Sequence, residues 1–155
     1  MSSDARILRG AIIAELSVAA RYGEDLAAAE LRADGVNPDE YGPLSIIGVL
    51  QPVTRTTLAE ATGWRRTTLR DALRRLIERG HVQERANPND GRSTLLELTP
   101  EGQGIFDRGK PAFHRALAKL DAALDGRLDE HEETVWTVRV ALQRLTSDRS
   151  SASVG

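Results

Sequence analysis

The stretch from Thr54 to Leu98 constrains the fold most, because helical and strand-like patterns follow each other there without a long linker. Thr54 can begin a short helix by accepting a hydrogen bond from a backbone N–H of the first turn, and Gly63 ends that helix. A second periodic run starts at once, near Arg65. The spacing therefore predicts two short helices across a tight turn, which is a helix-turn-helix.

The second helix and the segment after it complete this unit. The apolar residues of the helix recur at steps of three and four and form one stripe that must be buried. Gly80 ends the helix, and strand-like residues lie on both sides of the turn-forming run from Asn87 to Gly91, which predicts a two-stranded hairpin. The apolar stripe consists of Leu69, Ala72, Leu73, Leu76 and Ile77.

The opposite face of the second helix is basic. Most charge-rich helix faces are only solvated. Here, however, Arg65 and Arg66 stand in the first turn, where the helix dipole disfavours cations by roughly 0.3–1 kcal/mol, and no Ser, Thr or Asp occupies the capping position. A polyanionic partner would offset that cost. The face consists of Arg65, Arg66, Thr67, Thr68, Arg70, Asp71, Arg74 and Arg75.

The charge of the chain is unevenly distributed. Residues 54–92 carry nine Arg and five acidic residues, a net charge of +4, whereas the remaining residues carry twelve basic and eighteen acidic side chains, a net charge of −6. The overall net charge of −2 is thus the sum of a basic segment at residues 54–92 and acidic segments on both sides of it. This distribution favours a polyanion such as double-stranded DNA as the partner.

Long amphipathic segments surround this unit. A helix predicted over Asp4–Ala33 has apolar residues on more than one side, and a second long helix is expected over Pro100–Leu124. One small domain cannot cover so much apolar surface, which predicts a homodimer. A last helix should bury a stripe formed by Val135, Val138, Leu142 and Leu145.

Four motifs between Thr54 and Gly102 resemble the winged helix-turn-helix core of the MarR family of bacterial transcription regulators. They are TLAEATG, TTLRDALRRLIERGHV, the hairpin tip NPNDGRS and the closing LTPEG. The chain departs from the family's pattern at Arg65, where a small capping residue is usual, and at Asp71, where a basic residue is frequent. The family's DNA contacts therefore cannot be copied at these two positions.

The resemblance implies a mostly α fold of the α+β class. A single MarR-like domain would occupy residues 1–155. It would comprise a winged helix-turn-helix core with a two-stranded wing at residues 36–99 and long dimerisation helices at residues 1–35 and 100–146. The small polar residues at 147–155 predict a disordered tail.

The resemblance also implies a sequence-specific regulator, usually a repressor, that binds double-stranded DNA at a pseudo-palindromic operator. The second helix would enter the major groove, and Arg92 at the wing tip, with Asp90 holding the wing, would contact the minor groove. Asp71 would accept a hydrogen bond from cytosine or orient Arg75 one turn away. Two alternatives are a winged helix that binds only an acidic protein and a DNA-binding regulator without a small-molecule effector.

Proteins of this family commonly bind an aromatic, often anionic, small molecule in a cleft between the dimerisation helices and the winged core. The small residues of this chain could leave room for such a ligand, and a basic side chain could meet its carboxylate. The alternative is that the small residues only allow close helix packing. By resemblance, the candidate cleft residues are Leu16, Ala20, Arg21, Tyr41, Ile47, Phe113 and His114.

Other function classes lack support in the sequence. The chain has no cysteine, which excludes disulfides, thiolate metal sites and thiol redox sensing. It has no nucleophile motif, phosphate loop or metal-binding motif, so we predict no catalytic residue, metal or cofactor and a protein that is not an enzyme. His81 is expected to be a surface or strand-edge residue. The apolar N-terminal run is interrupted by Glu15 and too short to span a bilayer, which predicts a cytoplasmic protein without a membrane partner.

Overall fold

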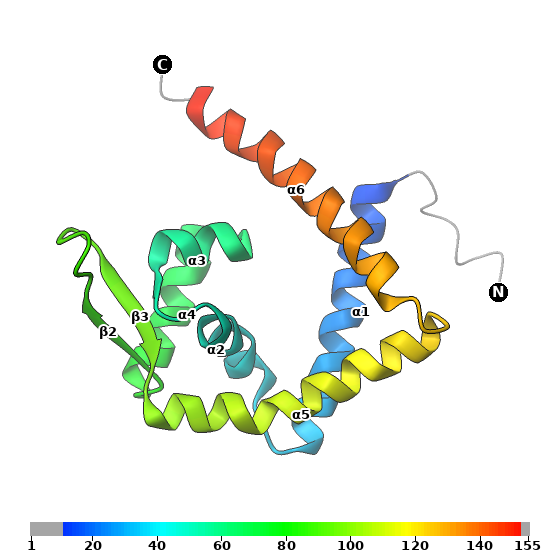
Figure 1. Cartoon of the computed structure of the whole chain (residues 1–155), viewed down its shortest axis with the longest axis horizontal. Coiled ribbons are helices and arrows are strands. Elements are labelled where there is room, and N and C mark those ends of the chain that lie inside the picture. Colours follow the sequence, from blue (N-terminus) through cyan, green and yellow to red (C-terminus); the bar gives the residue numbers. More distant parts are fainter. Residues whose placement is uncertain (1–10, 153–155) are drawn as a thin grey trace.

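The computed structural model describes residues 11–152, and the side chains of residues 11–146. Within this range the mostly α fold with a winged helix-turn-helix is confirmed (Figure 1). No helix in the described range is long and apolar enough to cross a membrane. In chain order the elements are α1 (Ile12–Ala33), α2 (Pro38–Leu50), β1 (Val53–Thr54), α3 (Arg55–Thr62), α4 (Arg66–Glu78), β2 (Val82–Ala86), β3 (Thr94–Leu98), α5 (Pro100–Ala123) and α6 (Leu128–Ala152).

The first and last helices differ in how far the structure tests their predicted ends. The start of the helix predicted from Asp4 lies outside the described residues, and so do residues 153–155. At the other end, α6 continues to Ala152 and thus enters the segment 147–155 that the sequence predicts to be disordered. Thr146 is therefore not the end of the last helix.

The predicted two-stranded wing is present as the β2–β3 hairpin, and β1 extends it to a three-stranded antiparallel sheet. The strand order is β1-β3-β2, with Val53 opposite Leu96 and Val82 opposite Leu98. β1 could not be predicted from the sequence, because this strand has only two residues, too few for an alternating pattern. Thr54, the last residue of β1, is also the N-cap of α3.

The hydrophobic core lies between α2, α4, the sheet and the first half of α5. Leu44, Ile47 and Leu96 are fully buried at its centre. The apolar stripe of α4 lies against them, with Leu69, Ala72, Leu73 and Leu76 buried and Ile77 partly buried, as predicted. This packing holds the basic face of α4 outward, because the two faces are opposite sides of one helix.

Helices α2 and α5 cross at very short range. The ring of Tyr41 is 2% exposed and stacks on Phe106 with 6.4 Å between ring centroids. The Tyr41 hydroxyl donates to the Phe106 carbonyl oxygen at 3.2 Å, and burial raises the pKa of Tyr41. Gly109 makes this approach possible, because a Cβ atom there would lie 2.0 Å from the tyrosine ring. The crossing therefore fixes α5 relative to the winged core.

An ionic cluster joins α1 to α5. Glu30 of α1 is buried and accepts hydrogen bonds from Lys119 and, at 2.9 Å, from Arg115 Nε. The Arg115 guanidinium also donates to Asp34 at 2.8 Å. Lys119 and Arg115 together hold the pKa of Glu30 below its usual value. The pairing satisfies a carboxylate that would otherwise be costly to bury.

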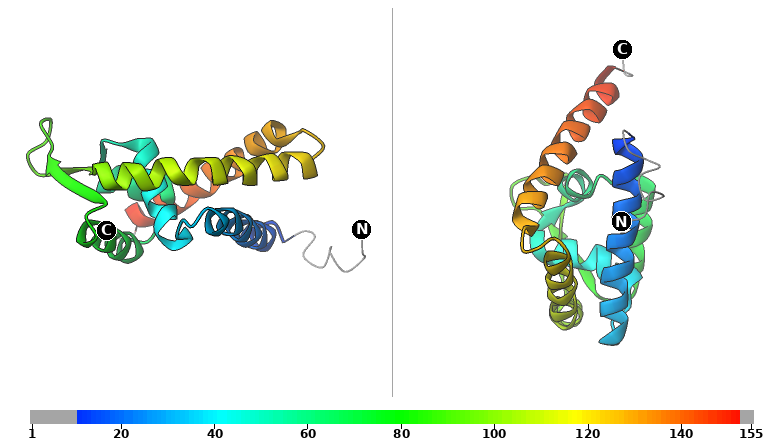
Figure 2. Two further views of the ribbon diagram at one scale, coloured as in Figure 1. Left: turned by 90° about the horizontal axis from the view of Figure 1, so that it is seen from below. Right: turned by 90° about the vertical axis from the view of Figure 1, so that its right-hand side faces the viewer.

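Helix α6 extends away from its own chain. Figure 1 shows it leaving the α5–α6 turn toward open space, and the right view of Figure 2 shows its C-terminal end projecting beyond the molecule. The stripe expected to be buried is open in the single chain, with Val135 55%, Leu142 38% and Leu145 66% exposed. Arg139 donates to the Ala61 carbonyl oxygen of α3 at 3.0 Å, which ties α6 to the helix-turn-helix.

Candidate nucleic-acid interface and ligand cleft

The turn between α3 and α4 has the geometry that its sequence predicts. Thr54 Oγ1 accepts from the Thr57 backbone N–H at 3.1 Å and caps α3. Gly63 ends α3 in the left-handed conformation at φ 67°, a region that residues with a side chain rarely occupy. Arg65 is the N-cap of α4 and makes no side-chain capping hydrogen bond. The first backbone N–H groups of α4 therefore remain available to an anion.

The structure brings the eight residues of the predicted basic face together on the outer side of α4. Asp71 is half-buried, and the other seven residues are exposed. Asp71 Oδ1 lies 3.9 Å from Arg70 Nε and 3.9 Å from Arg74 Nη2. The prediction that Asp71 orients Arg75 is thus wrong, because the carboxylate lies between two other arginines.

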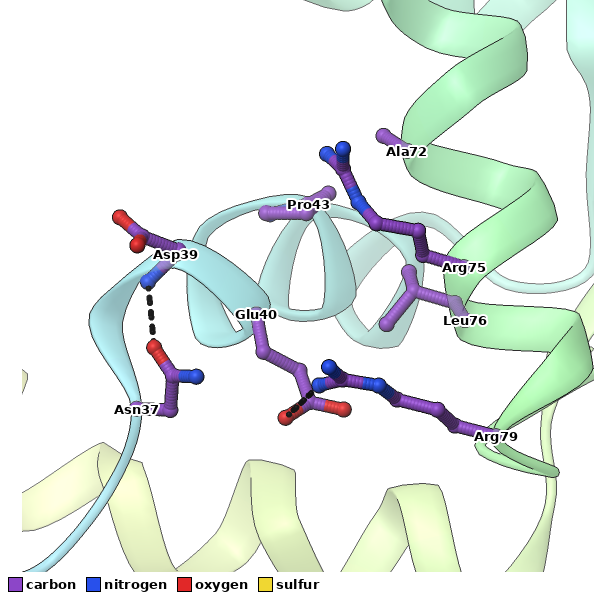
Figure 3. Close-up of a pocket in the computed structure, with 8 residues that line it drawn as sticks. All are labelled: Asn37, Asp39, Glu40, Pro43, Ala72, Arg75, Leu76 and Arg79. Atoms are coloured by element: carbon purple, nitrogen blue, oxygen red, sulfur yellow. Dashed lines mark hydrogen bonds and ion pairs between the residues drawn. The ribbon is translucent and has the colours of Figure 1, made fainter.

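The C-terminal end of α4 is held by a carboxylate from α2. Glu40 Oε2 accepts from Arg79 Nη1 at 3.0 Å (Figure 3). Glu40 Oε1 lies 2.5 Å from His81 Nδ1. His81 is 8% exposed and lies directly before β2, so the predicted surface position is wrong and the alternative of a strand-edge residue is retained. On its other side, His81 Nε2 lies 3.6 Å from a carboxylate oxygen of Glu101 in α5. Charged groups from three helices therefore meet at the exit of α4.

The start of α5 is joined to the same exit. The Thr99 backbone N–H donates to the His81 carbonyl oxygen at 3.0 Å, and Thr99 Oγ1 donates to the Gly80 carbonyl oxygen at 2.6 Å. Thr99 Oγ1 also accepts from the Gly102 backbone N–H at 3.1 Å and caps α5. A Cβ atom on Gly102 would lie 2.0 Å from the His81 carbonyl oxygen. The LTPEG motif thus anchors α5 on the end of α4.

The wing places one arginine at its tip. Asp90 Oδ1 accepts from the Arg92 backbone N–H at 3.0 Å, and Asn87 Nδ2 donates to Ser93 Oγ at 2.8 Å. These contacts close the turn between β2 and β3. The Arg92 side chain is exposed and makes no ion pair within the described part of the chain. It is therefore free to meet a phosphate or a base edge.

A cleft of about 630 Å³ lies between α1, α2, α4 and α5. Of the seven predicted cleft residues, Tyr41 and Phe113 line it. The other five do not: Leu16, Ala20 and Arg21 precede the segment of α1 that lines the cleft, Ile47 is fully buried in the core, and His114 is exposed but does not contribute to the cleft wall. The sequence reveals which residues share a face, but which turn of α1 meets the cleft depends on tertiary packing.

The cleft reaches α4. Its lining includes Trp64, Thr68, Ala72 and Arg75, which were not predicted from the sequence to be ligand-site residues. A neighbouring cavity of about 490 Å³ lies between α2 and α4 and shares Arg75 and Ala72 with the first (Figure 3). A molecule bound in the cleft would therefore contact the same helix that carries the basic face.

Sequence comparison finds similarity to transcription regulators. A family model described as "MarR family" matches residues 34–93, from the end of α1 to the wing tip. The HTH-type transcriptional regulator YdgG of Bacillus subtilis (strain 168) is 26% identical over 119 residues, which cover 76% of this chain and 76% of YdgG.

Structural comparison gives the same fold. A MarR family transcriptional regulator from Listeria monocytogenes, complexed with a 26mer DNA, superposes with a TM-score of 0.70 at 18% identity and covers 85% of this chain and 89% of its own. CouR from Rhodococcus jostii RHA1, bound to p-coumaroyl-CoA, superposes with a TM-score of 0.67 at 21% identity and covers 79% of this chain and 87% of its own. At these identities the likeness concerns the fold alone.

Proposed function

We propose that this chain, whose residues 34–93 match a model of the MarR family, is a transcription regulator of that family rather than an enzyme. In this proposal it is a homodimeric repressor that binds a pseudo-palindromic DNA operator. The observation that carries this proposal is the exposed basic face of α4, held outward by a buried apolar stripe. In this proposal α2 to β3 form the DNA-binding core, while α1, α5 and α6 build the dimer.

The recognition helix would lie in the major groove. Arginine reads guanine through its two acceptors, and threonine can contact a thymine methyl group or a phosphate. Thr67, Thr68, Arg70 and Arg74 are proposed to read bases, and Arg65, Arg66 and Arg75 to contact phosphates. Arg92 at the wing tip would enter the adjacent minor groove, where narrow A·T-rich sequence attracts arginine.

A two-fold dimer would present two such helices to one side of the duplex. Half-sites about 10–10.5 base pairs apart, or a multiple of that, would then match the two-fold symmetry of the protein. The proposal is supported by apolar side chains that the single chain leaves open on two of its long helices. They include Ile12, Ile13 and Tyr22 of α1 and Val135, Trp136, Leu142 and Leu145 of α6.

The Arg70→Ala substitution tests the DNA-binding face. We expect it to weaken binding to an operator selected from a random duplex library by about 1–3 kcal/mol and to relax the base preference at one position of each half-site. Fluorescence anisotropy with labelled duplexes measures both effects. Arg127→Ala is the matched control, because it removes the same charge from the exposed α5–α6 turn, at the opposite end of the molecule from the wing (Figure 1).

Two results would contradict this assignment. If Arg70→Ala leaves operator binding unchanged, α4 is not the helix that reads the operator sequence. Failure of the wild-type protein to prefer any duplex sequence, with salt-sensitive binding to an acidic protein instead, would favour the alternative of a protein-interaction module.

The cleft supports the proposal that the regulator responds to a small-molecule ligand. It is lined by the aromatic side chains of Trp64 and Phe113 and by the Arg75 guanidinium, which suit an aromatic anion. Because α4 forms one wall, a ligand there can prefer one arrangement of the two recognition helices. A full release of DNA requires a preference of roughly 10⁴-fold between the bound and free arrangements.

Thermal-shift measurements with aromatic carboxylic acids and p-coumaroyl-CoA test this part of the proposal. A ligand of the cleft should raise the melting temperature of the wild-type protein and weaken its binding to DNA. Both effects should be smaller in Phe113→Ala, which removes an aromatic wall whose ring is 43% exposed. If no compound stabilises the protein, or if the stabilising compounds leave DNA binding unchanged, the chain is a DNA-binding regulator without an effector of this class.

A further inference from the structure

We propose that Asp71 determines the specificity of the DNA-binding face. Its carboxylate restricts the positions of the Arg70 and Arg74 guanidinium groups relative to each other, and it lowers the affinity for every duplex that does not contact both arginines. This inference rests on the proposed DNA-binding function. It assigns a distinct role to Asp71, the one acidic residue of the basic face.

The geometry places the carboxylate between the two arginines. One oxygen, Asp71 Oδ1, lies 3.9 Å from Arg70 Nε and 3.9 Å from Arg74 Nη2. The Asp71 side chain is 49% exposed, against 72% for Arg70 and 65% for Arg74, so the carboxylate is less accessible to solvent than the two arginines. At 3.9 Å the attraction is ionic rather than a hydrogen bond, which leaves the guanidinium N–H groups available to base acceptors.

The charge of Asp71 has opposite effects on two kinds of DNA. A carboxylate on a surface that faces phosphates weakens binding to any duplex, because it opposes the electrostatic attraction that dominates non-specific binding. Restricting two flexible guanidiniums strengthens binding only where both find base acceptors at the separation that the carboxylate imposes. Together these effects raise the ratio of specific to non-specific affinity.

The test compares Asp71→Asn with a charge-matched control in the same helix. Asn keeps the size of the side chain and removes its charge. Glu78→Gln makes the same charge change in the last turn of α4, where Glu78 is exposed and has no ion pair within the described residues. Affinities for the operator selected by the wild-type protein and for a random duplex are measured by fluorescence anisotropy at several salt concentrations.

We expect Asp71→Asn to bind the random duplex about 2–10-fold more tightly than the wild-type protein, since one repulsive charge is gone. The ratio of specific to non-specific affinity should fall about tenfold, an effect the size of one mismatched base pair. Glu78→Gln should leave this ratio within about twofold of the wild-type value. The midpoint of urea unfolding should stay unchanged in both variants, because neither side chain belongs to the core.

Three results would overturn the inference. If the wild-type protein is sequence-specific and Asp71→Asn leaves the ratio of specific to non-specific affinity unchanged, the carboxylate has no part in specificity. An equal fall of the ratio in Glu78→Gln would assign the effect to net charge rather than to the contacts with Arg70 and Arg74. A wild-type protein without any sequence preference would overturn the proposed function and this inference together.

Discussion

Gly102→Ala is expected to lower the free energy of unfolding by about 1–3 kcal/mol or more, because the added methyl group has no space. Its Cβ atom would lie 2.0 Å from the carbonyl oxygen of His81. That oxygen cannot move away on its own, since it accepts a hydrogen bond from the Thr99 backbone N–H at 3.0 Å. The substitution must therefore push the start of α5 away from the end of α4, and DNA affinity should fall as well.

Gly104→Ala is the control for this experiment. Gly104 lies in the same helix, but a Cβ atom there would meet only Arg108 Nη1 at 3.8 Å, an ordinary contact. Replacing a glycine by alanine inside a helix at such a site should stabilise the protein by roughly 0.5–1 kcal/mol. Urea unfolding followed by circular dichroism measures both variants. Shifts of the unfolding midpoint in the same direction would contradict the contact between Gly102 and His81.

Leu142→Asp is expected to separate the proposed dimer and, with it, to weaken operator binding about 100-fold or more. Leu142 is 38% exposed in the single chain and shares one face of α6 with Val135 and Leu145. A carboxylate on an apolar interface without a partner is strongly unfavourable. Two linked recognition helices gain about 10²–10⁴-fold in affinity over one, and a monomer loses that gain.

Sedimentation velocity and operator binding measure this effect. Thr137→Asp is the control, because Thr137 is exposed on α6 away from the apolar stripe and should tolerate the charge. We expect the control to sediment as a dimer and to bind the operator like the wild-type protein. A wild-type monomer at micromolar concentration, or a Leu142→Asp dimer with normal affinity, would contradict the assignment of α6 to the dimer interface.

Local patterns in the sequence predicted the helix-turn-helix well. The cap at Thr54, the left-handed turn at Gly63 and the apolar stripe of α4 each depend on neighbouring residues, and each is present in the structure. The exposed basic face follows from the stripe, because burying one side of a helix exposes the other. Such features can be predicted because backbone geometry fixes the relation between residues a few positions apart.

The positions of contacts between distant segments could not be predicted in this way. The sequence contains Gly102 and Gly104 two residues apart, and only packing on the His81 carbonyl distinguishes the one that cannot be replaced. The buried position of His81 likewise depends on carboxylates supplied by Glu40 and Glu101, from two other helices.

The sequence by itself therefore determined the fold class, the helix-turn-helix and the basic face of α4, since these depend on periodicity and residue type. The tertiary structure decided three further features: the third strand β1, the segment of α1 that lines the cleft, and the pairing of Asp71 with Arg70 and Arg74 instead of Arg75. Each depends on how far apart two segments or side chains lie in space. That distance is set by the packing of the whole core rather than by local spacing along the chain.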